Sequence, residues 1–329
     1  MGDRIVDDIA SAVDHVEDDV LRLMFVCCHP TLGPDAQVTL TLRLMAGLTT
    51  AEIARSFLTS ESTIAARITR AKKNLARVAD PTEEPVGDER VARLSGVLRV
   101  VYLLFNEGYS ATAGDDWLRA DLCAEAVRLG RVLAELVPSD PEVHGLVALM
   151  ELQHSRSAAR IAVDGTPVLL LEQDRSRWDG LLVRRGLAAL DRATSLGAPV
   201  GPYVLQAEIA ACHARARVAT DTDWSRIASV YAVLAGVTGS AVVELNRVVA
   251  VSFADGPEAA LSLLDAADLA ELTDYHLLPS VRADLLAKIG RTSEAVDELE
   301  RAASLTTNQQ ERSMLLERAT SLASGHPDL

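Results

Sequence analysis

Sequence patterns typical of α-helices follow one another along most of this 329-residue chain. Apolar residues recur at helical spacing between capping residues, prolines and glycines, while aromatic residues make up only 4% of the composition. A core built from Ala, Leu and Val suits helix packing better than sheet packing. We therefore predict an all-α protein with helices at 18–28, 36–46, 51–58, 61–78, 89–105, 118–136, 141–158, 178–195, 202–219, 223–234, 241–252, 257–266, 275–289, 292–304 and 308–323. The exception is 161–171, where Asp164-Gly165 lies between short β-favouring runs and predicts a small hairpin.

A repeat is visible in the last third of the chain. Gly256 and Gly290 lie 34 residues apart, and each separates one apolar helix from the next. This is the period of tetratricopeptide repeats, and LLAKIGRTSEAVDELERAASL at 285–305 resembles the second half of such a repeat. We expect a stack of helical hairpins there.

Charge is distributed unevenly. The net charge of −15 argues against a chain that binds nucleic acid throughout, because phosphates are neutralised by clustered Lys and Arg. Residues 36–79 nevertheless carry seven bases against two acids, a local charge of +5 between acidic neighbours. Such a basic island indicates a small nucleic-acid-binding domain inside a larger acidic protein.

A domain boundary is suggested by the segment DPTEEPVG at 80–87, which holds two prolines, a glycine and three acids and is typical of a linker. We divide the chain into an acidic linker at 1–17, a domain at 18–79, a linker at 80–88 and a helical-repeat region at 89–329.

The basic island predicts a helix-turn-helix. Residues 49–57 form its supporting helix, Leu58 and Thr59 its turn, and Ser60 starts a recognition helix whose polar N-terminal side chains can enter a major groove. The predicted DNA contacts are Ser60 at the helix start, Ser62, Thr63, Ala66 and Arg67 at base edges, and Arg70, Lys72 and Lys73 nearer the phosphates.

The same residues resemble a known family. GLTTAEIA at 47–54 and STIAARITRAK at 62–72 look like region 4 of extracytoplasmic-function (ECF) sigma factors of the sigma-70 superfamily. LRLMFVCCHP at 21–30, VVYLLFNEGYSATAGDDW at 100–117, QDRSRWD at 173–179 and VELNRVVAV at 243–251 are similar to the subgroup with a long, tetratricopeptide-like C-terminal extension. The resemblance implies that the chain reads the promoter minus-35 element and contacts the β flap of the RNA polymerase core.

The family also carries a helical region 2 ahead of region 4, which binds the polymerase and melts the minus-10 element. Only a short acidic segment precedes Leu21 here, so region 2 is absent from the sequence as given. We expect this chain not to melt promoters alone.

Two polar and aromatic clusters are candidates for a partner or ligand site. Asn106, Glu107 and Tyr109, with Asp115-Asp116-Trp117, are expected in a loop after a helix, and Asp174, Arg175 and Trp178 in a charged turn. Loops with such content can bind ligands, but capping and turn formation explain both clusters as well.

Neither metal nor cofactor is predicted. Cys27-Cys28-His29 suggests zinc, but adjacent side chains on a helix point about 100° apart, and no second Cys/His pair lies nearby. We interpret these residues, and Cys212-His213, as packing residues. No nucleophile–base pair or phosphate loop is present, so we predict no enzymatic activity.

The sequence therefore predicts a DNA-binding sigma factor for transcription initiation, with a C-terminal domain that regulates it or binds an unknown protein or ligand. The alternative is a repeat adaptor for protein interactions whose helix-turn-helix is vestigial. No apolar run is long enough for a membrane span and no apolar signal segment is present, so a soluble, cytoplasmic protein without a membrane partner is expected.

Overall fold

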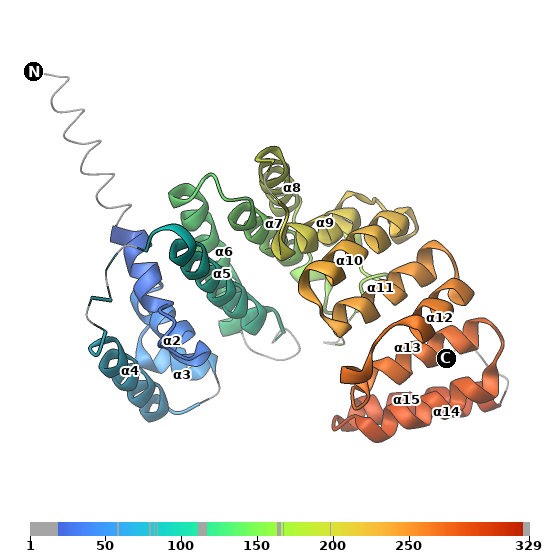
Figure 1. The fold of residues 1–329 in the computed structure, drawn as a ribbon. Helices are drawn as coiled ribbons and strands as arrows, with labels where there is room; N and C mark the ends of the chain where they lie inside the picture. Colours follow the sequence, from blue (N-terminus) through green and yellow to red (C-terminus); the bar gives the residue numbers. More distant parts are fainter. Residues whose placement is uncertain are drawn as a thin grey trace, which may run out of the picture. The chain divides into compact units, whose positions relative to one another are not determined.

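The computed structural model describes residues 19–324, except 58, 79, 82, 84, 111–116, 163–165, 167 and 198. Within this part the chain is all-helical and no β-strand occurs, so the predicted fold class is confirmed (Figure 1). Residues 19–27 are helical. The helices that follow are α2 (Pro34–Leu44), α3 (Thr50–Ser56), α4 (Glu61–Leu75), α5 (Gly87–Ser110), α6 (Trp117–Leu136), α7 (Pro141–Ser155), α8 (Gly180–Ser195), α9 (Pro202–Arg215), α10 (Trp224–Thr238), α11 (Ala241–Ala254), α12 (Pro257–Ala266), α13 (Leu277–Lys288), α14 (Thr292–Leu305) and α15 (Gln309–Ala323), with short 3-10 turns that include η1 (Ser157–Ala159) and η2 (Arg175–Arg177).

The chain divides into two compact units, one through Ala207 and one from Glu208 onward. The division falls inside α9, far from the segment 80–88 where the sequence suggests a boundary. The predicted linker is short in the structure, because α5 already begins at Gly87. The helix-turn-helix and the hairpins that follow it therefore belong to one unit.

A single apolar core explains why this unit does not divide at the linker. Leu42 on α2, Ile53 on α3 and Ile64 on α4 are fully buried in the same cluster as Leu104 on α5 and Leu146 on α7. Helix α2 packs against α5 and α3 packs against α6, and α5 and α6 run beside the first helices in Figure 1. The helix-turn-helix thus shares its hydrophobic stabilisation with the first two hairpins of the region after it.

Polar contacts also join the helix-turn-helix to α6. The Arg128 guanidinium on α6 donates a hydrogen bond of 3.0 Å to the carbonyl oxygen of Met45, which follows α2. Glu125 holds this guanidinium through an ion pair of 2.6 Å. The end of α2, whose last carbonyls lack helical partners, is in this way attached to α6.

Helix α7 forms the centre of the remaining part of the first unit. Its residues are buried on nearly every side, and it packs against α5, α6 and α8. Gly186 on α8 permits the close approach, because a Cβ atom there would lie 2.7 Å from Leu152. Buried Glu151 is paired with Arg131 of α6 at 2.6 Å, so its charge is compensated.

The predicted hairpin at 161–171 is only partly visible, because 163–165 and 167 lie outside the described residues. The Ala162 N–H donates to the Thr166 carbonyl at 2.9 Å, and the Val168 N–H donates to the Arg160 carbonyl at 2.8 Å. These bonds bring the two flanks together, although the described residues of this segment form no strand.

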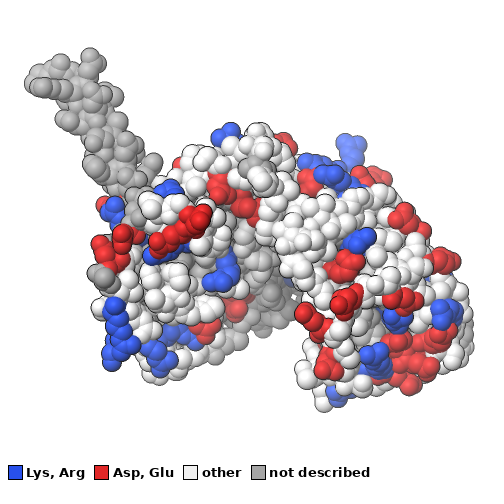
Figure 2. All heavy atoms as spheres, in the orientation of Figure 1, with Lys and Arg blue, Asp and Glu red and all other residues white. Residues whose placement is uncertain are grey.

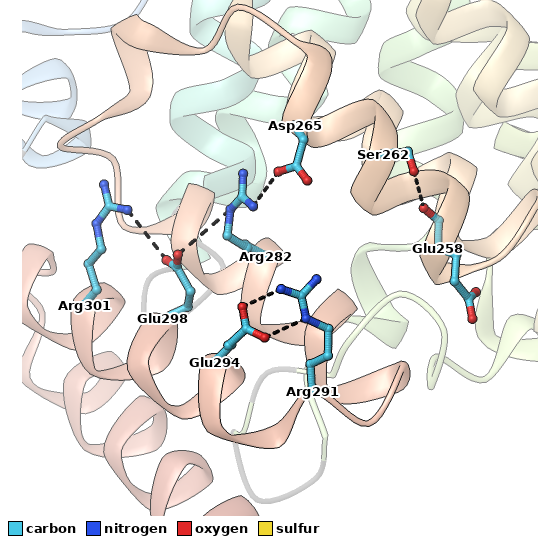
Figure 3. Close-up of polar contacts among 8 residues, drawn as sticks. All are labelled: Glu258, Ser262, Asp265, Arg282, Arg291, Glu294, Glu298 and Arg301. Atoms are coloured by element: carbon cyan, nitrogen blue, oxygen red, sulfur yellow. Dashed lines mark hydrogen bonds and ion pairs between the residues drawn. The ribbon is translucent and has the colours of Figure 1, made fainter.

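The second unit consists of antiparallel helices in sequence, with α10 against α11 and α14 against both α13 and α15. Gly256 and Gly290, the two glycines at repeat spacing, have φ angles of +96° and +79°, a conformation that favours glycine where one helix turns into the next. Figure 3 shows ion pairs on this stack: Arg282 on α13 lies 2.6 Å from Asp265 on α12 and 3.9 Å from Glu298 on α14, and Glu298 also pairs with Arg301.

Within the described residues, no helix combines the length and apolarity needed to cross a membrane.

The shared core leads to a prediction about truncation. A fragment of residues 19–80 lacks the apolar partners of α2 and α3 on α5 and α6, so we expect it to melt without a cooperative transition. A fragment of residues 1–217 keeps the core and should melt cooperatively. Circular dichroism during heating measures both, and a sharp transition in the short fragment would show that the core is divisible.

Candidate nucleic-acid interface

The supporting helix α3 begins with a reciprocal cap. The Thr49 hydroxyl accepts a hydrogen bond of 3.2 Å from the Glu52 N–H, and the Glu52 carboxylate accepts one of 2.7 Å from the Thr49 N–H. Hydrogen bonds from the Thr49 hydroxyl and backbone lower the pKa of Glu52. This capping box fixes where α3 starts, as the pattern Thr-x-x-Glu predicts.

Ser60 is the N-cap of the candidate recognition helix α4, at the position where the sequence predicts this helix to start. The Ser60 hydroxyl accepts a hydrogen bond of 3.2 Å from the Thr63 N–H and contacts the Thr63 hydroxyl at 2.8 Å. Ile64 and Ala71 form the buried side of α4, with Ile68 partly buried beside them. The opposite side of the helix is therefore left to solvent.

The exposed side of α4 carries most of the predicted DNA contacts. Seven of the eight predicted residues have exposed side chains: Ser60, Ser62, Thr63, Ala66, Arg70, Lys72 and Lys73. With 3.6 residues per turn, Ser62 and Ala66 lie on the face opposite Ile64, and Thr63 lies about 100° from Ile64 on the flank. Figure 2 shows basic side chains gathered over α4, at the lower left of the view.

Sequence reasoning did not include Arg77 among these contacts. Arg77 follows the end of α4 and is exposed. If the helical spacing of about 100° per residue is continued to Arg77, then Arg70, Lys73 and Arg77 lie within about 60° of one another around the helix axis. The spacing i, i+3, i+7 thus favours one stripe of three cations, whereas Lys72 lies about 100° from Lys73 on the flank of the helix.

Arg67 differs from the other predicted residues. Its guanidinium forms an ion pair of 3.1 Å with Asp35 and a hydrogen bond of 3.4 Å to the Thr39 hydroxyl, both on α2. Its side chain is half-buried, with 26% exposed. In this arrangement Arg67 contacts α2, and base reading would require release from Asp35.

The first of the two polar and aromatic clusters lies in a different element from the one predicted. Asn106, Glu107 and Tyr109 lie within the last turns of α5, not in a loop, because α5 continues to Ser110. The Tyr109 ring stacks on Phe105, with 5.4 Å between the ring centroids, and this packing supports the added turn. Asp115 and Asp116 lie outside the described residues, as does the side chain of Trp117.

The predicted charged turn is present at 174–178. Asp174 caps η2 by accepting hydrogen bonds from the Ser176 N–H at 2.9 Å and from its hydroxyl at 2.7 Å. The Arg175 guanidinium lies 5.3 Å from the centre of the Trp178 ring. Asp174, Arg175 and Trp178 thus have structural roles in this turn.

The cysteines lie in apolar surroundings. Burial raises the pKa of the Cys27 thiol to about 12, and burial together with neighbouring Cys27 raises the pKa of Cys28. Without a metal ion, thiols with such raised pKa values stay protonated at neutral pH. In the part of the chain that the structure describes, no three His, Cys, Asp or Glu residues are grouped to hold a metal ion.

Comparisons with known proteins agree with this geometry. The family model described as Sigma-70, region 4 matches residues 22–75, which include the helix-turn-helix, and this match supports a sigma-factor-like DNA-binding role for that part of the chain. A family of unknown function, DUF6596, matches residues 93–194. The chain belongs to the family of an uncharacterized protein of Rhizobium meliloti (strain 1021): the two are 45% identical over 307 residues, which cover 92% of this chain and 72% of that protein.

The ion pair between Arg67 and Asp35 can be tested directly. We expect Asp35→Asn to tighten DNA binding, because it removes a carboxylate that holds Arg67 and repels phosphates beside α4. Arg67→Ala should cost about 1–3 kcal/mol of discrimination if Arg67 reads a guanine. Titrations of a selected duplex and of its single-base variants measure both effects, and an equal loss on every sequence would make Arg67 a phosphate contact.

Proposed function

We propose that this chain is an ECF-type sigma factor that reads the promoter minus-35 element with α4 and contacts the RNA polymerase core through its β flap. The exposed basic face of α4, within a region 4 domain of an otherwise acidic chain, is the observation that carries the proposal. The place of action is the cytoplasm, where promoter DNA and polymerase are found.

The chemistry of the α4 face supports a division of roles. Arg70 and Lys73 in the C-terminal half, and Arg77 just after the helix, are long cations, which suit phosphate contacts that set orientation. Ser62 and Thr63 at the N-terminal half are small and polar, and Ala66 leaves room for a base edge or a thymine methyl group. Lys72 supplies a further phosphate contact at the flank.

For the C-terminal helical region we propose regulation of the region 4 domain or binding of a partner. Its stacked helical hairpins have the repeat spacing that suggests a tetratricopeptide-like scaffold, and residues from 80 onward carry a net charge of −14. An acidic surface repels DNA, or attracts the basic face of α4, and either effect weakens DNA binding.

Salt-dependent binding tests the role of α4. The full chain is titrated against a pool of random duplexes at several salt concentrations, and we expect selection of one sequence and a slope that reports several phosphate contacts. Arg70→Ala and Lys73→Ala should each reduce that slope by about 0.9, because each removes one phosphate contact.

Arg184→Ala on α8 is the matched control, because Arg184 is an exposed arginine outside the region 4 domain. Its slope should equal that of the unaltered chain. Absence of DNA binding by the unaltered chain would contradict direct promoter reading by this chain and favour the adaptor alternative.

Deletion of residues 217–329 tests regulation, and it leaves α9 whole. We expect the shortened chain to bind the selected duplex more tightly at low salt, because about half of the excess acidic charge is removed. Equal affinity of the two chains would favour a partner-binding role over masking.

A further inference from the structure

A group of arginines and aromatic rings lies where α5 and α7 end, within the first unit. The Arg160 guanidinium lies 3.8 Å from the centre of the Tyr109 ring, and that of Arg156 lies 5.6 Å from it. Arg160 also donates a hydrogen bond of 2.6 Å to the Tyr109 carbonyl oxygen, which caps the end of α5. Two cations therefore converge on one tyrosine.

Backbone contacts bring the turn at 173–178 to the same place. η1, directly after α7, contacts η2. The Asp179 N–H donates to the Ser155 carbonyl at 2.7 Å, next to Arg156. The Gln173 amide donates to the Val168 carbonyl at 3.1 Å, and the Val168 N–H bonds the Arg160 carbonyl. We call Tyr109, Arg156, Arg160, Gln173, Arg175 and Trp178 the arginine cluster.

Among the residues that the structure describes, Arg156 has no carboxylate partner. Its guanidinium lies 5.6 Å from the centre of the Tyr109 ring, and no carboxylate is among the groups that shift its pKa. Burial and the neighbouring Arg160 lower the pKa of Arg156, and the Tyr109 side chain only partly opposes them. A half-buried cation beside a second cation is costly unless an anion joins it.

Two further polar atoms in the arginine cluster are buried without a hydrogen-bond partner. These are the Trp178 Nε1–H, a donor, and the Gln173 Oε1, an acceptor. The Gln173 side chain is almost completely buried, with 6% exposed. Buried polar groups in proteins are nearly always paired, so an unpaired donor and acceptor in the turn that packs against η1, directly after Arg156, point to a ligand.

We propose that the arginine cluster binds a small oxyanion, a phosphate or carboxylate, that carries a neighbouring hydroxyl or amine. Arg156 and the Trp178 N–H donate to the oxyanion, and Gln173 Oε1 accepts from the hydroxyl or amine of the ligand. Arg is suited to this role because its planar fork matches both phosphate and carboxylate groups. The site is independent of α4, so it stands whether or not the chain binds DNA.

Calorimetric titration of the full chain at constant ionic strength tests the site, with ribose 5-phosphate, gluconate and ribose as probes. All three offer hydroxyl groups, but only the first two carry an oxyanion. We expect saturable binding of ribose 5-phosphate or gluconate, and whichever binds identifies the phosphate or the carboxylate class. Failure of both to bind, or equal binding of ribose, would overturn the proposal.

Substitutions in the arginine cluster test whether the ligand binds there. Arg156→Ala should weaken it by at least about tenfold, and Trp178→Phe, which keeps a packed ring and removes only the donor, by about tenfold. Arg184→Ala changes an exposed arginine of the same unit and should bind as the unaltered chain does. If Arg156→Ala does not fold, Trp178→Phe decides the outcome, and unchanged affinity in that variant would reject the arginine cluster as the site.

Discussion

The apolar core that joins the helix-turn-helix to α5, α6 and α7 is the constraint on which the first unit depends. Leu42 of α2 and Leu104 of α5 are buried in the same cluster, although they lie in segments matched by two different families. The region of unknown function is therefore not an appendage to a finished DNA-binding domain. It supplies apolar surface that the short helices α2 and α3 need, because helices of this length are not stable alone in water.

The positions of the helices could largely be predicted from sequence because their signals are local. Thr49 and Glu52 form the capping box that their spacing indicates, and Ser60 caps α4. The end of α5 was predicted too early, at Phe105, because the added turn depends on Tyr109 packing against Phe105 and on Arg160, 51 residues further along the chain. Contacts of that kind cannot be inferred from local spacing.

The same distinction between local spacing and long-range packing applies to the candidate DNA-binding face and to the arginine cluster. The exposed face of α4 follows from helical periodicity once Ile64 and Ala71 are taken as buried. The pairing of Arg67 with Asp35, and the meeting of Tyr109 with Arg156 and Arg160, depend on how separate helices pack. The sequence identified both clusters as candidates, but it could not show that they lie together or that α5 and α7 end beside them.

The use of arginine in place of lysine has a practical consequence for chemical labelling. The chain has three lysines, Lys72, Lys73 and Lys288, and the first two are exposed on α4. Lys288 lies in the second unit, where it pairs with Asp284 at 2.7 Å. Among side-chain amines, an amine-selective reagent therefore reports on α4 and on one internal reference, so that mass spectrometry can follow how far a partner covers a single helix.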